Sequence, residues 1–181
     1  MFFHLLKIHK ILYFWISKNI IYMADTYSRV YLHIVFAVKN RKALLDKLWR
    51  NELFAYMASS LNNRGHFSLA VNGYNDHVHL FFDYNCKELI SDLVREIKKS
   101  SNEFINTNGF CSVKFEWQNG YGVFSNGYRE KDIIIKYIIN QEKHHSKRSF
   151  KDEYFSLLNT YEVEYKNEYV FEFFDEIDLK N

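Results

Sequence analysis

Two histidines separated by one valine precede an apolar run in the segment NDHVHLFF, residues 75–82. In a β-strand side chains alternate between two faces, so His77 and His79 would share one face while Val78 and Leu80 point into a core. Two imidazoles about 7 Å apart on one strand face can converge on a single metal ion. The pattern also fits two polar histidines on the solvated face of a half-buried strand, and the segment alone leaves both interpretations open.

The composition favours one compact domain. With 181 residues, of which 48% are hydrophobic and 19% aromatic, the chain can bury a sizeable core. Proline is absent and glycine is scarce, which argues against flexible linkers. Cys86 and Cys111 lie far apart without the spacing of a metal site. We therefore predict ordinary thiols, no disulfide framework and a cytoplasmic location.

The formal net charge of +2 conceals an asymmetry along the chain. Residues 1–151 carry 22 Lys and Arg against 13 Asp and Glu, whereas residues 152–181 carry 2 against 9. The basic body suits a polyanionic partner such as nucleic acid, and the acidic tail would lie away from that partner or mask it.

Residues 1–22 differ in character from the rest of the chain. They are apolar with three scattered lysines, and their longest apolar run, residues 11–16, is too short to span a bilayer. No small-residue cleavage site of a secretory signal follows. We predict no membrane span and interpret this segment as translation from an upstream start codon or as a disordered lead, with Met23 as a natural start. A peripheral membrane helix is the alternative.

Residue patterns divide the middle of the chain into strands and helices. The predicted strands cover residues 27–38, 67–73, the histidine segment and 113–117, and a glycine-punctuated segment follows at 119–125. The predicted helices cover residues 46–63, 87–106, 129–147 and 151–158, the first with an apolar stripe that begins at Leu48 and the second with one that begins at Leu89.

This order predicts an α+β fold. It is a ferredoxin-like split βαβ arrangement, with an antiparallel sheet, helices on one face and an appended helix. The predicted domain spans residues 23–158, and residues 159–181 form the acidic C-terminal tail.

The appended helix carries groups that match the histidine pair chemically. Tyr137 and Gln141 are four residues apart and therefore share a helical face, with His144 roughly on the same side. Two neutral imidazoles and one amide oxygen would leave positions open on a divalent ion, where a phosphate oxygen can bind. A tyrosine hydroxyl, with an ordinary pKa near 10, becomes a useful nucleophile only where a nearby cation stabilises the phenolate.

Four segments together resemble the HUH-type tyrosine transposases of small bacterial insertion sequences and their relatives at repetitive palindromes. They are DHVHL at residues 76–80, KKSS at 98–101, WQNGYGVFS at 117–125 and YIINQEKHH at 137–145. Each segment is weak evidence alone, but their order and spacing make the resemblance specific over residues 27–158. Family members often have proline where this chain has Asn75, and Val-Ser where it has Asn126-Gly127.

The resemblance assigns roles to individual residues. It implies that His77 and His79 bind a divalent metal, Mg²⁺ or Mn²⁺, with Gln141 as the third ligand, and that Tyr137 is the nucleophile. Tyr137 would attack a phosphodiester of single-stranded DNA, giving a 5′-phosphotyrosine and a free 3′-hydroxyl. The resemblance further implies DNA hairpins as ligands and a homodimer in which a helix of one subunit completes the site of the other in trans.

Basic residues near these segments are candidate DNA contacts. We predict that Arg95, Lys98, Lys99, Lys143 and Arg148 contact the DNA backbone, with an ordinary solvated face as the alternative for the lysine pair. The leading hypothesis is a transposase that cleaves and rejoins single-stranded DNA. The alternatives are a catalytically idle DNA-hairpin-binding protein and a metal-dependent phosphodiesterase that uses water instead of Tyr137.

Overall fold

The computed structural model of the chain describes residues 27–40 and 44–174. The predicted lead, residues 1–22, lies outside the described residues. The elements in chain order are β1 (Tyr31–Ala37), α2 (Arg50–Asn63), β2 (Phe67–Gly73), β3 (His77–Asp83), α3 (Ile90–Thr107), β4 (Gly122–Asn126), the 3-10 turn η2 (Tyr128–Glu130), α4 (Lys131–Ile139), α5 (Gln141–His145), α6 (Phe150–Thr160) and the 3-10 turn η3 (Asn167–Tyr169).

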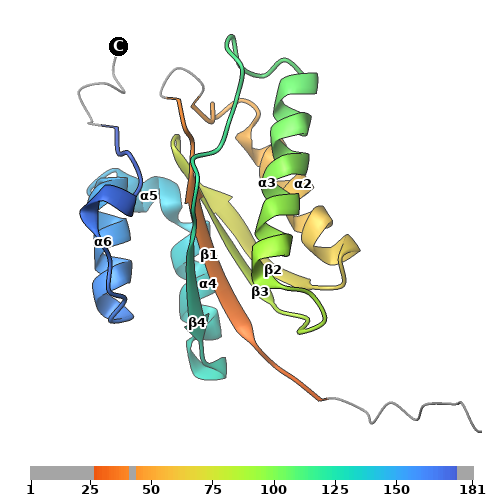
Figure 1. Cartoon of the computed structure of the whole chain (residues 1–181), viewed down its shortest axis with the longest axis vertical. Helices are drawn as coiled ribbons and strands as arrows, with labels where there is room; N and C mark the ends of the chain where they lie inside the picture. The colour runs from red at the N-terminus through yellow and green to blue at the C-terminus, as the bar shows by residue number, and fades with distance from the viewer. Residues whose placement is uncertain (1–26, 41–43, 175–181) are drawn as a thin grey trace, which may run out of the picture.

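The four strands form one antiparallel sheet in the order β2-β3-β1-β4. Helix α2 connects β1 to β2 and helix α3 connects β3 to β4, and both lie on the same side of the sheet, whereas α4, α5 and α6 lie on the other side (Figure 1). This is the ferredoxin-like α+β arrangement that the element order predicts.

Strand register places the histidines at the centre of the sheet. β3 lies between β1 and β2, with His77 opposite Ala37 and His79 opposite Val35. Val78, Leu80 and Phe82 point to the α2–α3 side and are at most 1% exposed, so the predicted alternation is confirmed. Both histidines therefore face the layer that α4, α5 and α6 form.

The predicted fourth strand at residues 113–117 is wrong. The sheet is completed by β4, within the glycine-punctuated segment, and only Trp117 of the predicted strand makes an isolated bridge, to Val38. The side chain of Asn106 explains the difference, because its amide accepts from Phe115 N (2.9 Å) and donates to Phe115 O (3.1 Å). The backbone groups of Phe115 therefore bond to a side chain at the end of α3 and do not take part in the hydrogen bonds of the sheet.

Three helix predictions need smaller corrections. Leu48 and Leu89 precede α2 and α3 and are 90% and 68% exposed, so they do not belong to the apolar stripes. The helix predicted over residues 129–147 is divided, with a break at Asn140 between α4 and α5. At this break the side chain of Asn72 on β2 donates to the carbonyls of Ile138 (2.9 Å) and Ile139 (2.8 Å). These are carbonyls that the end of a helix leaves unpaired.

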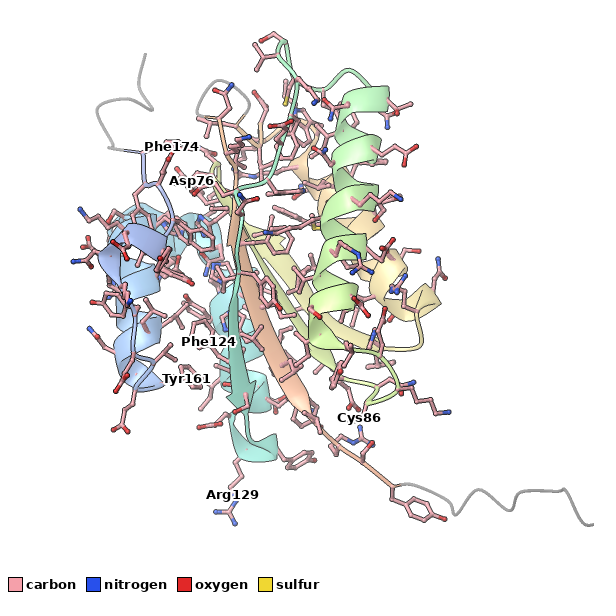
Figure 2. The ribbon with its side chains drawn as sticks, in the orientation of Figure 1. Asp76, Cys86, Phe124, Arg129, Tyr161 and Phe174 are labelled. Atoms are coloured by element: carbon pink, nitrogen blue, oxygen red, sulfur yellow. The ribbon has the colours of Figure 1, made fainter. Side chains whose placement is uncertain are left out.

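The C-terminal segment holds α6 against the domain. Phe171 is buried against Phe150 and Tyr154, with ring centroids 6.0 and 4.7 Å apart. The side chain of Gln118 bonds to both backbone groups of Glu172. Tyr161 packs on Phe124 of β4 at 4.9 Å between centroids (Figure 2). Phe171 and Glu172 therefore hold the described part of the acidic tail to the fold, whereas residues 162–169 are exposed.

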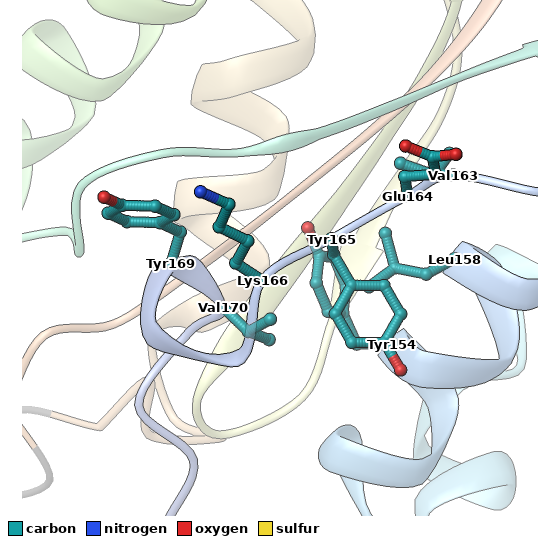
Figure 3. Close-up of a pocket in the computed structure, with 8 residues that line it drawn as sticks. All are labelled: Tyr154, Leu158, Val163, Glu164, Tyr165, Lys166, Tyr169 and Val170. Carbon is teal, nitrogen blue, oxygen red and sulfur yellow. The ribbon is translucent and has the colours of Figure 1, made fainter.

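Between α6 and this segment lies a cavity of about 500 Å³, lined in part by Tyr154, Tyr165 and Tyr169 (Figure 3). None of its lining residues is a predicted site residue. Across the described ranges, no helix has the length and apolar character needed to cross a bilayer.

Removing the Leu80 side chain should destabilise the fold. Leu80 is 1% exposed in the core below α2 and α3. We expect Leu80→Ala to lower the free energy of unfolding by about 2–5 kcal/mol in urea denaturation. Leu48→Ala is the matched control, expected to change it by less than about 0.5 kcal/mol because Leu48 is exposed. Equal losses in both variants would contradict this core assignment.

Candidate active site

Both histidines of β3 are fully buried, and each has a partner that orients its ring. Nδ1 of His77 lies 2.7 Å from Oδ1 of Asp76, and Nδ1 of His79 lies 2.8 Å from Nε2 of His33 on β1. These bonds leave the Nε2 atom of each β3 histidine directed at the same side chain. A buried carboxylate or ring nitrogen that fixes a histidine in this way is typical of the surroundings of metal ligands.

Asp76 and His33 belong to the candidate site, and the sequence analysis assigned neither of them a role. Asp76 directly precedes β3. It lies at the end of the strand that is near α5 and the C-terminal segment (Figure 2). His33 is opposite Phe81 and Phe124 in the sheet register, which places its side chain on the histidine face. An orienting role for His33 depends on this pairing between distant strands, so the sequence carried no signal for it.

Tyr137 and Gln141 come to the same place from α4 and α5. The Tyr137 ring lies edge-on to the His79 ring, with centroids 5.8 Å apart. Gln141 is fully buried, with Oε1 3.5 Å from Nε2 of His77. The structure therefore brings together all four residues that the resemblance places in the active site, within one chain.

Glu153 of α6 lies at the centre of this group. Its Oε1 accepts hydrogen bonds from the Tyr137 hydroxyl and from Gln141 Nε2 (3.0 Å). Its Oε2 lies 3.4 Å from His77 Nε2 and 3.6 Å from His79 Nε2.

Two further histidines of α5 approach the same carboxylate. His145 Nε2 lies 3.0 Å from Oε2, and His144 Nε2 lies 3.5 Å from Oε1. His145 is buried and His144 is partly exposed. Glu153 thus stands among four imidazoles and one phenol.

Sequence reasoning missed Glu153, although a signal existed. Phe150, Tyr154 and Leu158 repeat every four residues and form the buried stripe of α6. Glu153 lies three residues after Phe150 and one before Tyr154, so it falls on the same apolar face and is 2% exposed. A carboxylate on the apolar face of a helix requires a partner, and that requirement marks a candidate site.

The charges of the site depend on one another. Burial opposes ionisation of Glu153, but the surrounding histidines, led by His79, outweigh burial and hold the pKa of its carboxyl below the ordinary value. Burial lowers the pKa of His79 to about 4. Burial also acts to lower the pKa of His77, but the hydrogen bond and charge of Asp76 raise it overall. Burial and then the Glu153 charge raise the pKa of Tyr137, so its hydroxyl stays protonated at neutral pH beside the free carboxylate.

The donor set fits a divalent metal. One ligand atom from each of His77, His79 and Glu153 lies within 4.8 Å of the others, and all three residues are buried. His79 Nε2 is buried without a hydrogen-bond partner among the described residues, which is the state expected of an atom that binds an ion. Imidazole and carboxylate ligands suit Mn²⁺ and other transition metals and tolerate Mg²⁺.

The predicted DNA contacts divide between two sides of the sheet. Arg95, Lys98 and Lys99 are on α3, on the side away from Tyr137 (Figure 1). The Lys98 ammonium donates to the carbonyls of Gln118 (2.8 Å) and Gly120, and burial lowers its pKa to about 8. The Lys98 ammonium is therefore engaged in hydrogen bonds that hold the loop before β4 in place.

The other two predicted contacts lie beside Tyr137. Lys143 and Arg148 line a cavity together with Tyr137. This cavity is formed by α4, α5 and the turn that follows them, so it lies on the same side of the sheet as the histidine pair.

Comparison with known proteins points to one family. A family model described as "Transposase IS200 like" matches residues 26–141, which is more than half of the chain. The match ends at Gln141, so Glu153 lies beyond it. A search of curated proteins finds no significant match.

Two solved structures resemble the chain. One is a provisionally assigned transposase from Deinococcus radiodurans R1, with a TM-score of 0.51 and 20% identity over 65% of this chain and 94% of that chain. The other is a REP-associated tyrosine transposase bound to a REP hairpin, with a TM-score of 0.48 and 20% identity over 66% of this chain and 72% of that chain. At this identity the first likeness shows a common fold.

Asp76→Asn should weaken metal binding without removing a ligand. Loss of the carboxylate that orients His77 is expected to raise the Kd for Mn²⁺ about 10–100-fold in calorimetric titration of the metal into the protein. The titration is best done at pH 8, because the raised pKa of His77 makes protons compete with the metal at lower pH. Asp83→Asn, at the far end of β3, is the matched control. An unchanged Kd in Asp76→Asn, or an equal loss in Asp83→Asn, would contradict the orienting role.

Proposed function

The chain belongs to the IS200-like transposase family, and from this premise we propose that it cleaves and rejoins single-stranded DNA through a covalent bond to Tyr137. One observation carries the proposal: the Tyr137 hydroxyl bonds to Glu153, which is also a member of the buried group that could hold a metal. The proposed nucleophile therefore lies beside the residues that would hold a metal, and a metal there could polarise a phosphate next to the tyrosine.

The proposed reaction exchanges one phosphodiester for another. The Tyr137 oxygen forms a bond to phosphorus and loses its proton, while the bond from phosphorus to the 3′-oxygen breaks and that oxygen gains a proton. The products are a 5′-phosphotyrosine and a free 3′-hydroxyl. The energy of the phosphodiester is kept in the tyrosine linkage, so attack by a second 3′-hydroxyl rejoins the strands without ATP.

His77, His79 and Glu153 would hold the divalent ion, Mg²⁺ or Mn²⁺, whose charge would polarise the phosphate and favour the phenolate of Tyr137. We propose Gln141 as a further ligand, since its Oε1 lies near His77 Nε2. Because Nδ1 of His77 and Nδ1 of His79 are bonded to Asp76 and His33, the two Nε2 atoms would be the ones that bind the ion. Glu153 holds the phenol oxygen beside the histidine pair.

The partners follow from the family resemblance and stay predictions. We propose that the ligand is single-stranded DNA with a hairpin near the cleavage site, and that Lys143 and Arg148 contact its backbone near Tyr137. Arg95 and Lys99 would contact DNA on the α3 side of the sheet. A homodimer and a cytoplasmic location are also predicted.

Tyr137→Phe should abolish covalent attachment to DNA. Labelled single strands from the flanks of the gene would be incubated with the protein and Mn²⁺ and run on a denaturing gel. The native chain is expected to give an SDS-resistant adduct that both Tyr137→Phe and His77→Ala lose. Tyr128→Phe, at an exposed tyrosine of η2, is the matched control and should keep the adduct.

The same gel separates the alternatives. Cleavage that persists in Tyr137→Phe would identify water as the nucleophile and would contradict the tyrosine mechanism. Binding without cleavage by the folded native chain, with its own flanking DNA, would identify an idle hairpin-binding protein.

Mixing two inactive variants should show whether the site is shared between subunits. The chain's own Tyr137 lies beside its own His79, so a homodimer would complete its sites in trans only if subunits exchanged α4 and α5. From this geometry we expect that an equimolar mixture of Tyr137→Phe and His77→Ala forms no adduct. Recovery of the adduct in the mixture would instead establish the exchange that the family resemblance predicts.

A further inference from the structure

A basic cavity opens beside the proposed nucleophile. It has a volume of about 650 Å³, and Tyr137 and His144 form part of its wall. Four cationic side chains, those of Lys136, Lys143, Lys147 and Arg148, also line it, and none of its lining residues is acidic. We call this space the Tyr137 cavity. Its lining favours a ligand with several negative charges.

The lining residues fall into two rows along α4, α5 and the turn that follows. Tyr137, His144 and Arg148 occupy one row, in which Tyr137 and His144 approach the carboxylate of Glu153. Lys136, Lys143 and Lys147 each precede a member of that row by one residue and form a parallel outer row. The outer row runs from α4 across the break at Asn140 to the turn after α5, so its three ammonium groups can meet more than one phosphate of a DNA strand.

The cations of the outer row are not neutralised by the protein. Within residues 27–40 and 44–174, no carboxylate forms an ion pair with Lys136, Lys143 or Lys147, and all three are exposed. Other lysines of the chain are paired, such as Lys47 with Glu142 and Lys39 with Glu116. Among the residues that the structure describes, the Arg148 guanidinium donates to the backbone carbonyl of Asp152 (2.9 Å) and pairs with no carboxylate. Uncompensated charge therefore gathers around the cavity.

We propose that the Tyr137 cavity binds the sugar–phosphate backbone of a single DNA strand, with Lys136, Lys143 and Lys147 as phosphate contacts. The proposal deepens the proposed function, because it places the strand that Tyr137 would cut. Tyr137 is only partly exposed and its hydroxyl bonds to a buried carboxylate. A flexible single strand can bend into such a recess, whereas the rigid rod of a duplex presents its phosphates to a more open surface.

Equilibrium binding without metal tests the proposal. Fluorescence anisotropy would measure the affinity of the full chain for fluorescein-labelled (dT)₂₀ in EDTA, at several KCl concentrations. We expect Lys136→Gln, Lys143→Gln and Lys147→Gln each to weaken binding about 3–10-fold. Each should also make the slope of log K against log[KCl] less negative by roughly 0.7, the value for one phosphate contact on a single strand.

Lys151→Gln is the matched control. Lys151 is exposed on α6 and does not line the cavity, so the same loss of charge there should leave affinity and salt slope unchanged. Circular dichroism would confirm that the variants fold like the native chain.

Three results would overturn the proposal: no binding of (dT)₂₀ by the native chain, salt slopes in the lysine variants equal to the native slope, or an equal change in Lys151→Gln. Because EDTA prevents cleavage, this binding does not depend on the proposed chemistry. Lost affinity in the lysine variants combined with no adduct on the gel would keep the cavity assignment and reject the transposase mechanism.

Discussion

The buried carboxylate of Glu153 is the interaction on which the rest of the site depends. An ionised carboxylate that is 2% exposed is unfavourable unless cations or hydrogen-bond donors surround it. Here the donors are Tyr137 and Gln141, and the imidazoles of His77, His79, His144 and His145 supply the remaining contacts. These groups lie on β3, α4 and α5. The carboxylate of Glu153 therefore holds polar side chains of β3, α4 and α5 together at one point.

The fold provides the two conditions that such a site needs. The sheet holds the histidines at a fixed register on its central strand, with their other nitrogens already bonded to Asp76 and His33. The helices α4, α5 and α6 exclude water from that face, and α6 does so by stacking Phe150 on the His77 ring, with centroids 4.0 Å apart. Phe171 packs on Phe150 of α6, and the hydrogen bonds between Gln118 and Glu172 hold the segment that carries Phe171. Residues far beyond the family match therefore contribute to the site.

The fold and half of the site could be predicted from local sequence patterns. Alternation in residues 75–82 gave the correct faces for His77 and His79, and helical spacing placed Tyr137 beside Gln141. The predictions that were wrong involved contacts between distant segments: Asn106 binds the backbone at Phe115 and shifts the fourth strand to residues 122–126. Likewise, the side chain of Asn72 on β2 donates to the backbone at the break between α4 and α5, which the sequence predicted as one helix. Glu153 carried a local signal on the apolar face of α6, but its partners could be found only in three dimensions.

The central claim is that His77, His79 and Glu153 of a single chain hold the metal beside Tyr137. Crystals of the full chain grown with Mn²⁺ would test it most directly through an anomalous difference map. The account predicts a peak within roughly 2.0–2.3 Å of His77 Nε2, His79 Nε2 and a Glu153 oxygen of the same chain. A peak bound to the two histidines and Gln141 with Glu153 turned away, or one whose ligands come from two chains, would contradict it.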